Sequence, residues 1–249
     1  MSVLNRFLGR SPHWSGCSKR GGRNENQDTW TAGRVGLNRW AVVLADGLGG
    51  HADGRLAADT AVKAAMTALR RSAKLALDEA ALSAARAAAH SLAEMRRRRD
   101  SDMASTLCLL VFDRARAAWA HCGDSRLYRL ESGGSVRRLT VDHSAVMATL
   151  PEDKRLTADV RDRPGRNRLV AVLGMNDPLI DQGFEALAPG IGYALCSDGY
   201  WESAADDALF QGLGPSAGPT ELVDDAVLRQ GPEGDNVTLA VVWPMGRRQ

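Results

Sequence analysis

Five aspartates lie beside apolar segments whose lengths suit β-strands: Asp28, Asp46, Asp124, Asp198 and Asp235. Each one alone is better explained as a turn residue or a cap. If their strands are neighbours, however, the carboxylates converge at one edge, where they repel one another unless cations neutralise them. Oxygen-only ligands suit Mg²⁺ or Mn²⁺ rather than Zn²⁺. A carboxylate can bridge two such ions about 3.5–4 Å apart, as in two-metal hydrolytic sites.

The loop that begins at Asp46 allows three interpretations. The apolar run at residues 41–45 predicts a buried strand, and Asp46-Gly47-Leu48-Gly49-Gly50-His51 follows it. The loop can be a tight Asp-Gly turn, a dinucleotide-binding fingerprint of the type G-x-G-x-x-A, or a metal loop in which a glycine carbonyl approaches a cation without a side chain in the way. A dinucleotide-binding unit needs a parallel strand after its helix. A second helical pattern follows here instead, which disfavours that interpretation.

The composition is that of a globular protein. The chain has 249 residues, of which 44% are hydrophobic and 25% charged, and its net charge of +2 gives no reason to expect a nucleic-acid partner. We find neither the apolar core of a signal peptide nor a membrane-spanning stretch of about 20 apolar residues. The four cysteines form no C-x-x-C pair and no cluster that a zinc site would need. We therefore expect a cytoplasmic protein in a reducing compartment.

The periodicity of apolar residues predicts two helices between residues 53 and 95, where alanines and larger apolar side chains recur at helical spacing. Two further helices are expected at residues 202–210 and 220–230. Strands separated by short turns favour an antiparallel sheet; they are expected at residues 13–18, 29–32, 39–45, 107–112, 115–121, 127–130, 135–139, 179–184, 191–196 and 237–243. We predict an α+β fold with one domain at residues 13–245, preceded by a flexible arm at residues 1–12.

Taken together, the aspartate motifs resemble a known family. They are Arg23-x-x-Asn26-Gln27-Asp28, Ala45-Asp46-Gly47-x-Gly49-Gly50-His51, Gly123-Asp124-Ser125-Arg126, Cys196-Ser197-Asp198-Gly199 and Gly234-Asp235-Asn236-Val237-Thr238. In this order and at these separations they resemble the PP2C-type (PPM) metal-dependent serine/threonine protein phosphatases, in the compact bacterial form. The resemblance runs from about Ser15 to Val242. Each motif is weak alone, but the ordered set is highly specific.

The resemblance implies a four-layer α-β-β-α sandwich, with two antiparallel sheets flanked by helix pairs and with a flap at about residues 142–176. It also implies a centre of two Mn²⁺ or Mg²⁺ ions and a third, weaker ion. By position in the motifs, Asp46 bridges the two ions and the Gly47 carbonyl joins the first. Asp198 and Asp235 hold the second ion, and Asp28 acts from the edge of the first site through water. The third ion is bound by Asp124 together with Asp198.

The implied reaction is the hydrolysis of phosphoserine and phosphothreonine in proteins by a water molecule that the cations activate. Arg23 is the candidate for binding the phosphate, because a guanidinium pairs with phosphate oxygens bidentately. The resemblance further implies a phosphoprotein substrate, a bacterial Ser/Thr kinase whose action the enzyme opposes, and a monomer. The alternative is a phosphoprotein-binding module on the same fold. Degenerate relatives of that kind typically lose metal aspartates, whereas this chain keeps all the matching ones.

Three positions depart from the family pattern or have no clear role in it. Many eukaryotic relatives carry a histidine, proposed as the general acid, where this chain has Leu48. His51 matches the family motif, and we expect it to order the loop through a hydrogen bond. The segment at residues 169–174 lacks the arginine that usually precedes its Leu-Gly pair, so the family's flap-based selection of substrates is not carried over to this chain.

Overall fold

The computed structural model describes residues 11–49, 52–131, 134–206, 208–211, 213 and 218–245. Two antiparallel sheets make up its centre. One has the strand order β1-β11-β10-β7-β8, and the other has the order β2-β3-β5-β6-β9, with β4 paired to β3. The strands are β1 (His13–Lys19), β2 (Asp28–Gly36), β3 (Arg39–Leu48), β4 (Ala104–Ser105), β5 (Leu107–Phe112), β6 (Arg116–Cys122), β7 (Arg126–Leu130), β8 (Val136–Arg138), β9 (Asp181–Ala186), β10 (Gly192–Cys196) and β11 (Val237–Trp243).

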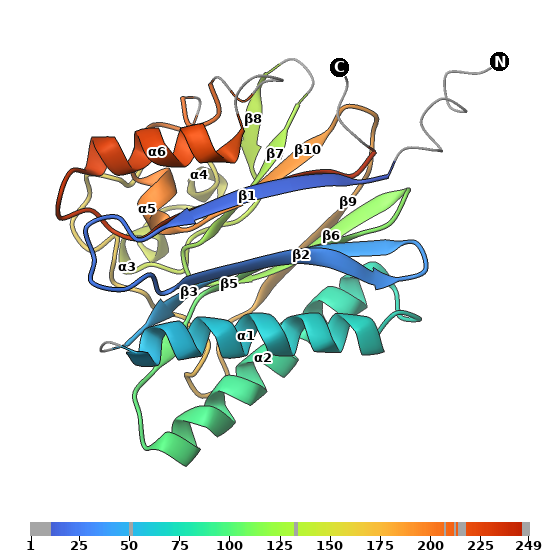
Figure 1. Cartoon of the computed structure of the whole chain (residues 1–249), viewed down its shortest axis with the longest axis horizontal. Helices are drawn as coiled ribbons and strands as arrows, with labels where there is room; N and C mark the ends of the chain where they lie inside the picture. Colours follow the sequence, from blue (N-terminus) through green and yellow to red (C-terminus); the bar gives the residue numbers. More distant parts are fainter. Residues whose placement is uncertain are drawn as a thin grey trace.

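Helices cover the outer face of each sheet (Figure 1). The long antiparallel pair α1 (Ala52–Arg71) and α2 (Leu77–Arg99) packs on the sheet that contains β3, and α5 (Asp198–Trp201) and α6 (Pro219–Gln230) pack on the sheet that contains β11. The predicted α+β sandwich of four layers is confirmed. Among the helices that the structure describes, none is both long enough and apolar enough to cross a membrane.

The core follows from alternation along the strands. In β3, the side chains of Val42 and Leu44 pack between the sheets, whereas those of Val43 and Ala45 pack under the helices. The strand β5 reads Leu-Cys-Leu-Leu-Val-Phe and is buried along its whole length, because both of its faces are covered. The helices present mostly alanine to the sheet, which lets them approach it closely. This packing fixes the strand ends, where the predicted site residues lie.

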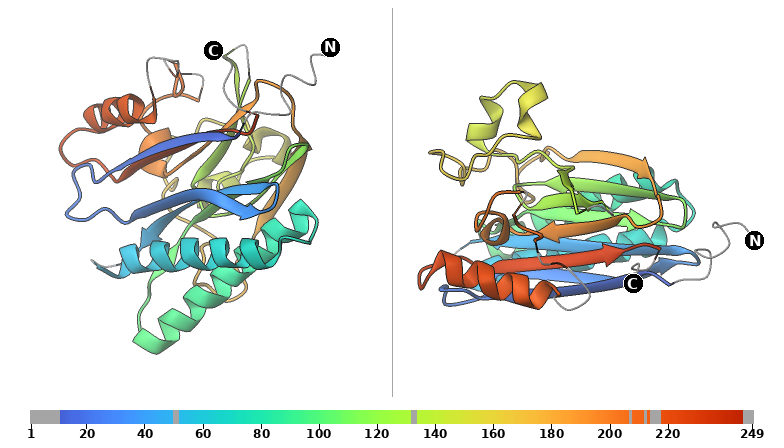
Figure 2. Two further views of the ribbon diagram at one scale, coloured as in Figure 1. Left: turned by 45° about the vertical axis from the view of Figure 1, so that its right-hand side comes forward. Right: turned by 90° about the horizontal axis from the view of Figure 1, so that it is seen from above.

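Much of the segment at residues 142–176, in yellow, projects beyond the sheets at the upper left of the right-hand view of Figure 2. It contains the short helices α3 (Ala145–Ala148) and α4 (Glu152–Arg155). The ends of this segment are part of the core, because Asp142 and Leu173 are buried. Leu173 exchanges two backbone hydrogen bonds with Ser105, at 2.8 and 3.1 Å. The predicted flap is therefore anchored at both ends. The predicted arm at residues 1–12 lies almost entirely outside the described residues.

The prediction of a helix at residues 202–210 is wrong. The helical turn α5 begins earlier, at Asp198, and the described residues after it form successive turns. Tertiary contacts override the helical pattern here, since Asp206 accepts a hydrogen bond from the Tyr128 hydroxyl at 2.9 Å and pairs with Arg126 at 3.3 Å. The Tyr200 hydroxyl donates to the Leu209 carbonyl at 2.5 Å. These bonds turn the chain back over β7.

Candidate active site

The topology brings the five aspartates to one end of the sandwich. Asp28 opens β2 and Asp46 lies near the end of β3, directly opposite it in the register of the two strands. Asp198 follows β10 and Asp235 precedes β11, and these strands are antiparallel neighbours in the other sheet. Asp124 lies in the turn from β6 to β7, where the chain crosses between the sheets. The site is thus built from the facing ends of both sheets.

Asp28 joins the two sheets at this end. Its Oδ2 accepts hydrogen bonds from the Ser197 hydroxyl at 2.7 Å and from the Thr238 hydroxyl at 2.6 Å, and both donors belong to the other sheet. Its Oδ1 is buried and has no hydrogen-bond partner among the described residues. Burial raises the pKa of Asp28 to about 6, against the two hydroxyl bonds, which lower it. A buried carboxylate oxygen without a partner is a free ligand for a cation.

The carboxylates of this cluster raise one another's pKa. Burial raises the pKa of Asp46 well above its ordinary value, and the neighbouring charges of Asp28 and Asp198 raise it further. The pKa of Asp198 is also raised well above its ordinary value, first by burial and then by Asp124. Burial, followed by the charge of Asp142, raises the pKa of Asp124 to about 7. Convergent buried carboxylates with only oxygen donors fit divalent cations of the Mg²⁺ or Mn²⁺ type.

The backbone of the Asp46 loop is held in place from both sides. The Asp46 amide donates to the Thr106 hydroxyl at 2.9 Å, and the Gly47 amide donates to the Gln27 carbonyl at 3.2 Å. A Cβ atom at Gly47 would collide with the carbonyl oxygen of Gly54 in α1, so no other residue fits there. His51, which we expected to order this loop, lies outside the described residues. Leu48 lines the cleft and offers no proton donor.

Arg23 reaches the cleft from the loop between β1 and β2. Its Nη2 pairs with Asp235 Oδ2 at 2.7 Å, and this hydrogen bond raises the pKa of Arg23. Asn236 holds the loop: its Nδ2 donates to the carbonyls of Arg20 at 2.7 Å and Glu25 at 2.9 Å, and its Oδ1 accepts from the Gln27 amide at 2.8 Å. Asn236 is therefore a positioning residue, a role that its place in the motif alone did not predict.

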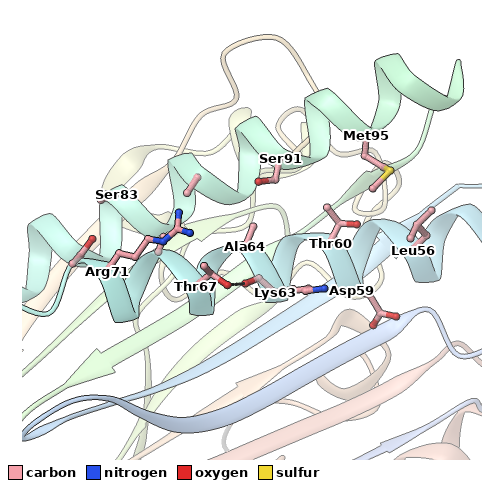
Figure 3. Close-up of a pocket in the computed structure, with 13 residues that line it drawn as sticks. Leu56, Asp59, Thr60, Lys63, Ala64, Thr67, Arg71, Ser83, Ser91 and Met95 are labelled. Atoms are coloured by element: carbon pink, nitrogen blue, oxygen red, sulfur yellow. Dashed lines mark hydrogen bonds between the residues drawn. The ribbon is translucent and has the colours of Figure 1, made fainter.

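The cleft has a volume of about 430 Å³ and is lined by Arg23, Gln27, Asp46, Gly47, Leu48, Asp198, Asp235 and Asn236 among others. A larger groove of about 640 Å³ lies between α1 and α2, and none of these residues lines it (Figure 3). Its lining contains Thr60, Ala64 and Thr67, with Asp59 as its only carboxylate. The groove also contains Lys63 and Arg71, but its described lining has no cluster of carboxylates, so we place the candidate site in the smaller cleft.

Asp124 lies behind this cleft, not in its wall. It is 4% exposed, and its carbonyl accepts a hydrogen bond from the Trp201 indole at 2.9 Å. The adjacent Arg126 forms a buried two-pronged pair with Asp142, at 2.9 and 2.7 Å, and its guanidinium stacks 3.5 Å from the centre of a Trp201 ring. Asp142 was not predicted as part of the site. Its only signal in the sequence is that it opens the irregular segment after β8.

Comparisons with known proteins agree with a phosphatase centre. The profile of the family "Protein phosphatase 2C" matches residues 15–216. The serine/threonine protein phosphatase PstP of Mycobacterium tuberculosis is 29% identical over 226 residues, which cover 88% of this chain and 42% of PstP. A putative protein phosphatase 2C-type of Streptococcus pyogenes is 30% identical over 215 residues, which cover 81% of this chain and 84% of that protein. The chain thus spans less than half of PstP.

Solved structures of other proteins show the same fold. The crystal structure of M. tuberculosis PstP superposes with a TM-score of 0.81 at 26% identity, covering 93% of this chain and 97% of that one. A PstP catalytic domain in complex with two manganese ions superposes with a TM-score of 0.78 at 27% identity and the same coverage. The fold is that of the protein phosphatase 2C domains. The chain belongs to the protein phosphatase 2C family of serine/threonine protein phosphatases.

Proposed function

We propose that this chain is an active protein phosphatase that hydrolyses phosphoserine and phosphothreonine. The observation that carries the proposal is the convergence of the carboxylates of Asp46, Asp198 and Asp235 in one cleft with the guanidinium of Arg23. The cluster needs cations for charge balance, and the arginine adds a fixed positive group for a phosphate.

Each site residue has a proposed role. Asp46 would hold two divalent cations, the first of them together with the Gly47 carbonyl. Asp198 and Asp235 would hold the second, and Asp28 would support the first from the edge of the cluster. Asp124 and Asp198 would hold a third, weaker ion. The unpartnered Oδ1 of Asp28 and the close passage of Gly47 under α1 support these assignments.

When bound, the cations supply an acidified water as the nucleophile and neutralise the phosphate. The chain's own residues orient the substrate. Arg23 is tied to Asp235 by one nitrogen, and its remaining N–H groups can bind two phosphate oxygens. The hydrogen bonds of Asn236 to the loop at residues 20–27 fix that guanidinium over the cleft. Leu48 provides no acid, so the proton for the leaving alcohol must come from another donor.

The open cleft can admit a side chain carried on a folded protein, which supports a phosphoprotein substrate. We propose that the protein acts on phosphoproteins and opposes a Ser/Thr kinase in signalling. It works as a cytoplasmic monomer whose phosphatase domain is residues 13–245. The third ion and the choice of Mn²⁺ or Mg²⁺ belong to the same proposal.

A phosphoprotein-binding module on the same fold is the alternative. It is not favoured, because every matching aspartate and Arg23 are retained. Binding and hydrolysis can be separated with a phosphothreonine peptide, by measuring phosphate release with Mn²⁺ and with EDTA. We expect release by the wild type in Mn²⁺ alone and loss of release in Asp46→Ala. The exposed acid Glu79 in the first turn of α2 serves as the matched control, and Glu79→Ala keeps the activity. Peptide binding without any release would favour the binding module.

A further inference from the structure

A second cluster of ligand-type side chains lies at the outer edge of the β6–β9 pair. His121 in β6 and Asp181 in β9 are directly opposite each other in the strand register. His143, from the start of the segment at residues 142–176, stacks edge-on against His121 with 4.8 Å between ring centres. One ligand atom from each of the three residues lies within 4.8 Å of the others. None of the three belongs to the centre around Asp46.

His121 is a polar side chain in an apolar layer. It continues the row of Ala117 and Trp119 on the face of β6 that packs between the sheets, and it is fully buried. Neither of its ring nitrogens has a partner within hydrogen-bond geometry among the described residues, and the Ser125 backbone makes only the smallest contribution to the pKa of the ring. An unpaired buried imidazole is unfavourable unless a further group binds it. Burial lowers the pKa of His121 to about 3, so the ring is neutral and keeps a lone pair for coordination.

His143 and Asp181 provide the other side of the cluster. His143 Nε2 lies 3.2 Å from Asp181 Oδ2. Ligands about 2.0–2.1 Å from a tetrahedral Zn²⁺ ion are about 3.3 Å from each other, which is close to this separation. The His143 side chain is buried, whereas that of Asp181 is half exposed. Asp181 therefore lies at the solvent-exposed side of the cluster, from which a metal ion and a water ligand can reach the rings of His121 and His143.

We propose that His121, His143 and Asp181 form a binding site for a transition-metal dication of the Zn²⁺ type, separate from the oxygen-only centre around Asp46. Two imidazoles and one carboxylate are a donor set that Zn²⁺ prefers and that Mg²⁺ and Mn²⁺ do not. Three protein ligands leave a fourth position for water. The His121 ring turns towards the other two ligands when the ion binds, and the ion replaces the missing hydrogen-bond partner.

Binding at this site has a consequence for the neighbouring turn. His143 Nδ1 now accepts a hydrogen bond from the Gly123 amide at 3.2 Å. An ion on Nε2 of a neutral ring leaves the proton on Nδ1, so the Gly123 amide must turn to another acceptor. Gly123 precedes Asp124, so the ion would release the hydrogen bond that now joins His143 to the turn carrying Asp124, and would tie His143 to β6 and β9 instead.

The test is a titration of the full chain with Zn²⁺ in the presence of excess Mn²⁺, which keeps the oxygen-only centre occupied. Competition with a chromophoric chelator gives the affinity, and the imidazole signals of the histidines in NMR spectra report which rings are bound. The variants are His121→Gln and Asp181→Ala. Asp181→Ala lies at the exposed rim and leaves the core intact, so it keeps the test valid even if His121→Gln unfolds. His90→Gln, an exposed histidine beside Glu94 in α2, is the matched control.

While Mn²⁺ occupies the oxygen-only centre, we expect one Zn²⁺ ion to bind per chain. Its binding should shift the NMR signals of His121 and His143. The affinity falls at least about tenfold in Asp181→Ala and His121→Gln and is unchanged in His90→Gln. The site also survives Asp46→Asn, which separates this proposal from the proposed phosphatase activity. No Zn²⁺ uptake in excess Mn²⁺, or uptake that neither variant weakens, would overturn it.

Discussion

Replacing Asp124 by asparagine tests how much the burial and mutual repulsion of the carboxylates destabilise the metal-free protein. Asp124 is buried, and its pKa is raised from 3.8 to about 7 by burial and by the charges of Asp142 and Glu202. A carboxyl whose pKa is raised on folding stabilises the folded state below its unfolded pKa, and this contribution is lost as the pH rises through the folded pKa. Asn has nearly the same shape and stays neutral. Asp124→Asn should therefore stabilise the protein in EDTA, and more so at high pH.

The magnitude follows from the two pKa values. Linkage destabilises the folded wild type by about 1–2 kcal/mol at pH 5, where the buried carboxyl is protonated, and by about 4 kcal/mol at pH 8, where it is ionised. These are upper limits on the gain in Asp124→Asn. Mn²⁺ added at pH 8 neutralises the carboxylate in the wild type, so the difference between the two proteins shrinks.

Urea unfolding at pH 5 and pH 8, in EDTA and in Mn²⁺, measures these differences. The control is Asp153→Asn in α4, whose side chain is 72% exposed and which should show no change between the two pH values. The reasoning is refuted if Asp124→Asn is less stable than the wild type at pH 8 in EDTA, or if its advantage is the same at both pH values.

Three further substitutions have expected outcomes. Arg23→Ala removes the proposed phosphate ligand, and kcat/KM for a phosphothreonine peptide should fall about 10–100-fold, as for loss of a charged hydrogen bond. Unchanged kinetics would show that Arg23 does not bind the phosphate. Gly47→Ala forces a Cβ against Gly54, so calorimetry should show at least about tenfold weaker Mn²⁺ binding. Asn236→Ala leaves its backbone partners unpaired, and urea unfolding should show a loss of about 2 kcal/mol.

The strands and their ends could be predicted because alternation and apolar runs are local signals. Thus β11 begins at Val237 and ends at Trp243, as expected, and Asp235 precedes it. The convergence of the aspartates needed only the further assumption that neighbouring strands share an edge. Two further features could not be predicted, because they depend on pairing between distant segments. They are the register that places Asp28 opposite Asp46, and the hydrogen bonds of Asp28 with the hydroxyls of Ser197 and Thr238.

Other features could not be predicted because long-range contacts decide them. Asp206 draws the chain after α5 into turns through its bonds with Tyr128 and Arg126, although the local pattern is helical. His121, His143 and Asp181 have no motif spacing, and only the β6–β9 pairing and the path of residues 142–176 bring them together.

The most direct test of the proposed function is phosphate release from a phosphothreonine peptide by metal-stripped protein as Mn²⁺ is added back. We predict no release without metal, a rise that saturates as Mn²⁺ binds, and no recovery at any Mn²⁺ concentration in Asp46→Ala. Release from the metal-stripped protein, or release by Asp46→Ala at the wild-type rate, would contradict a cation centre built on Asp46.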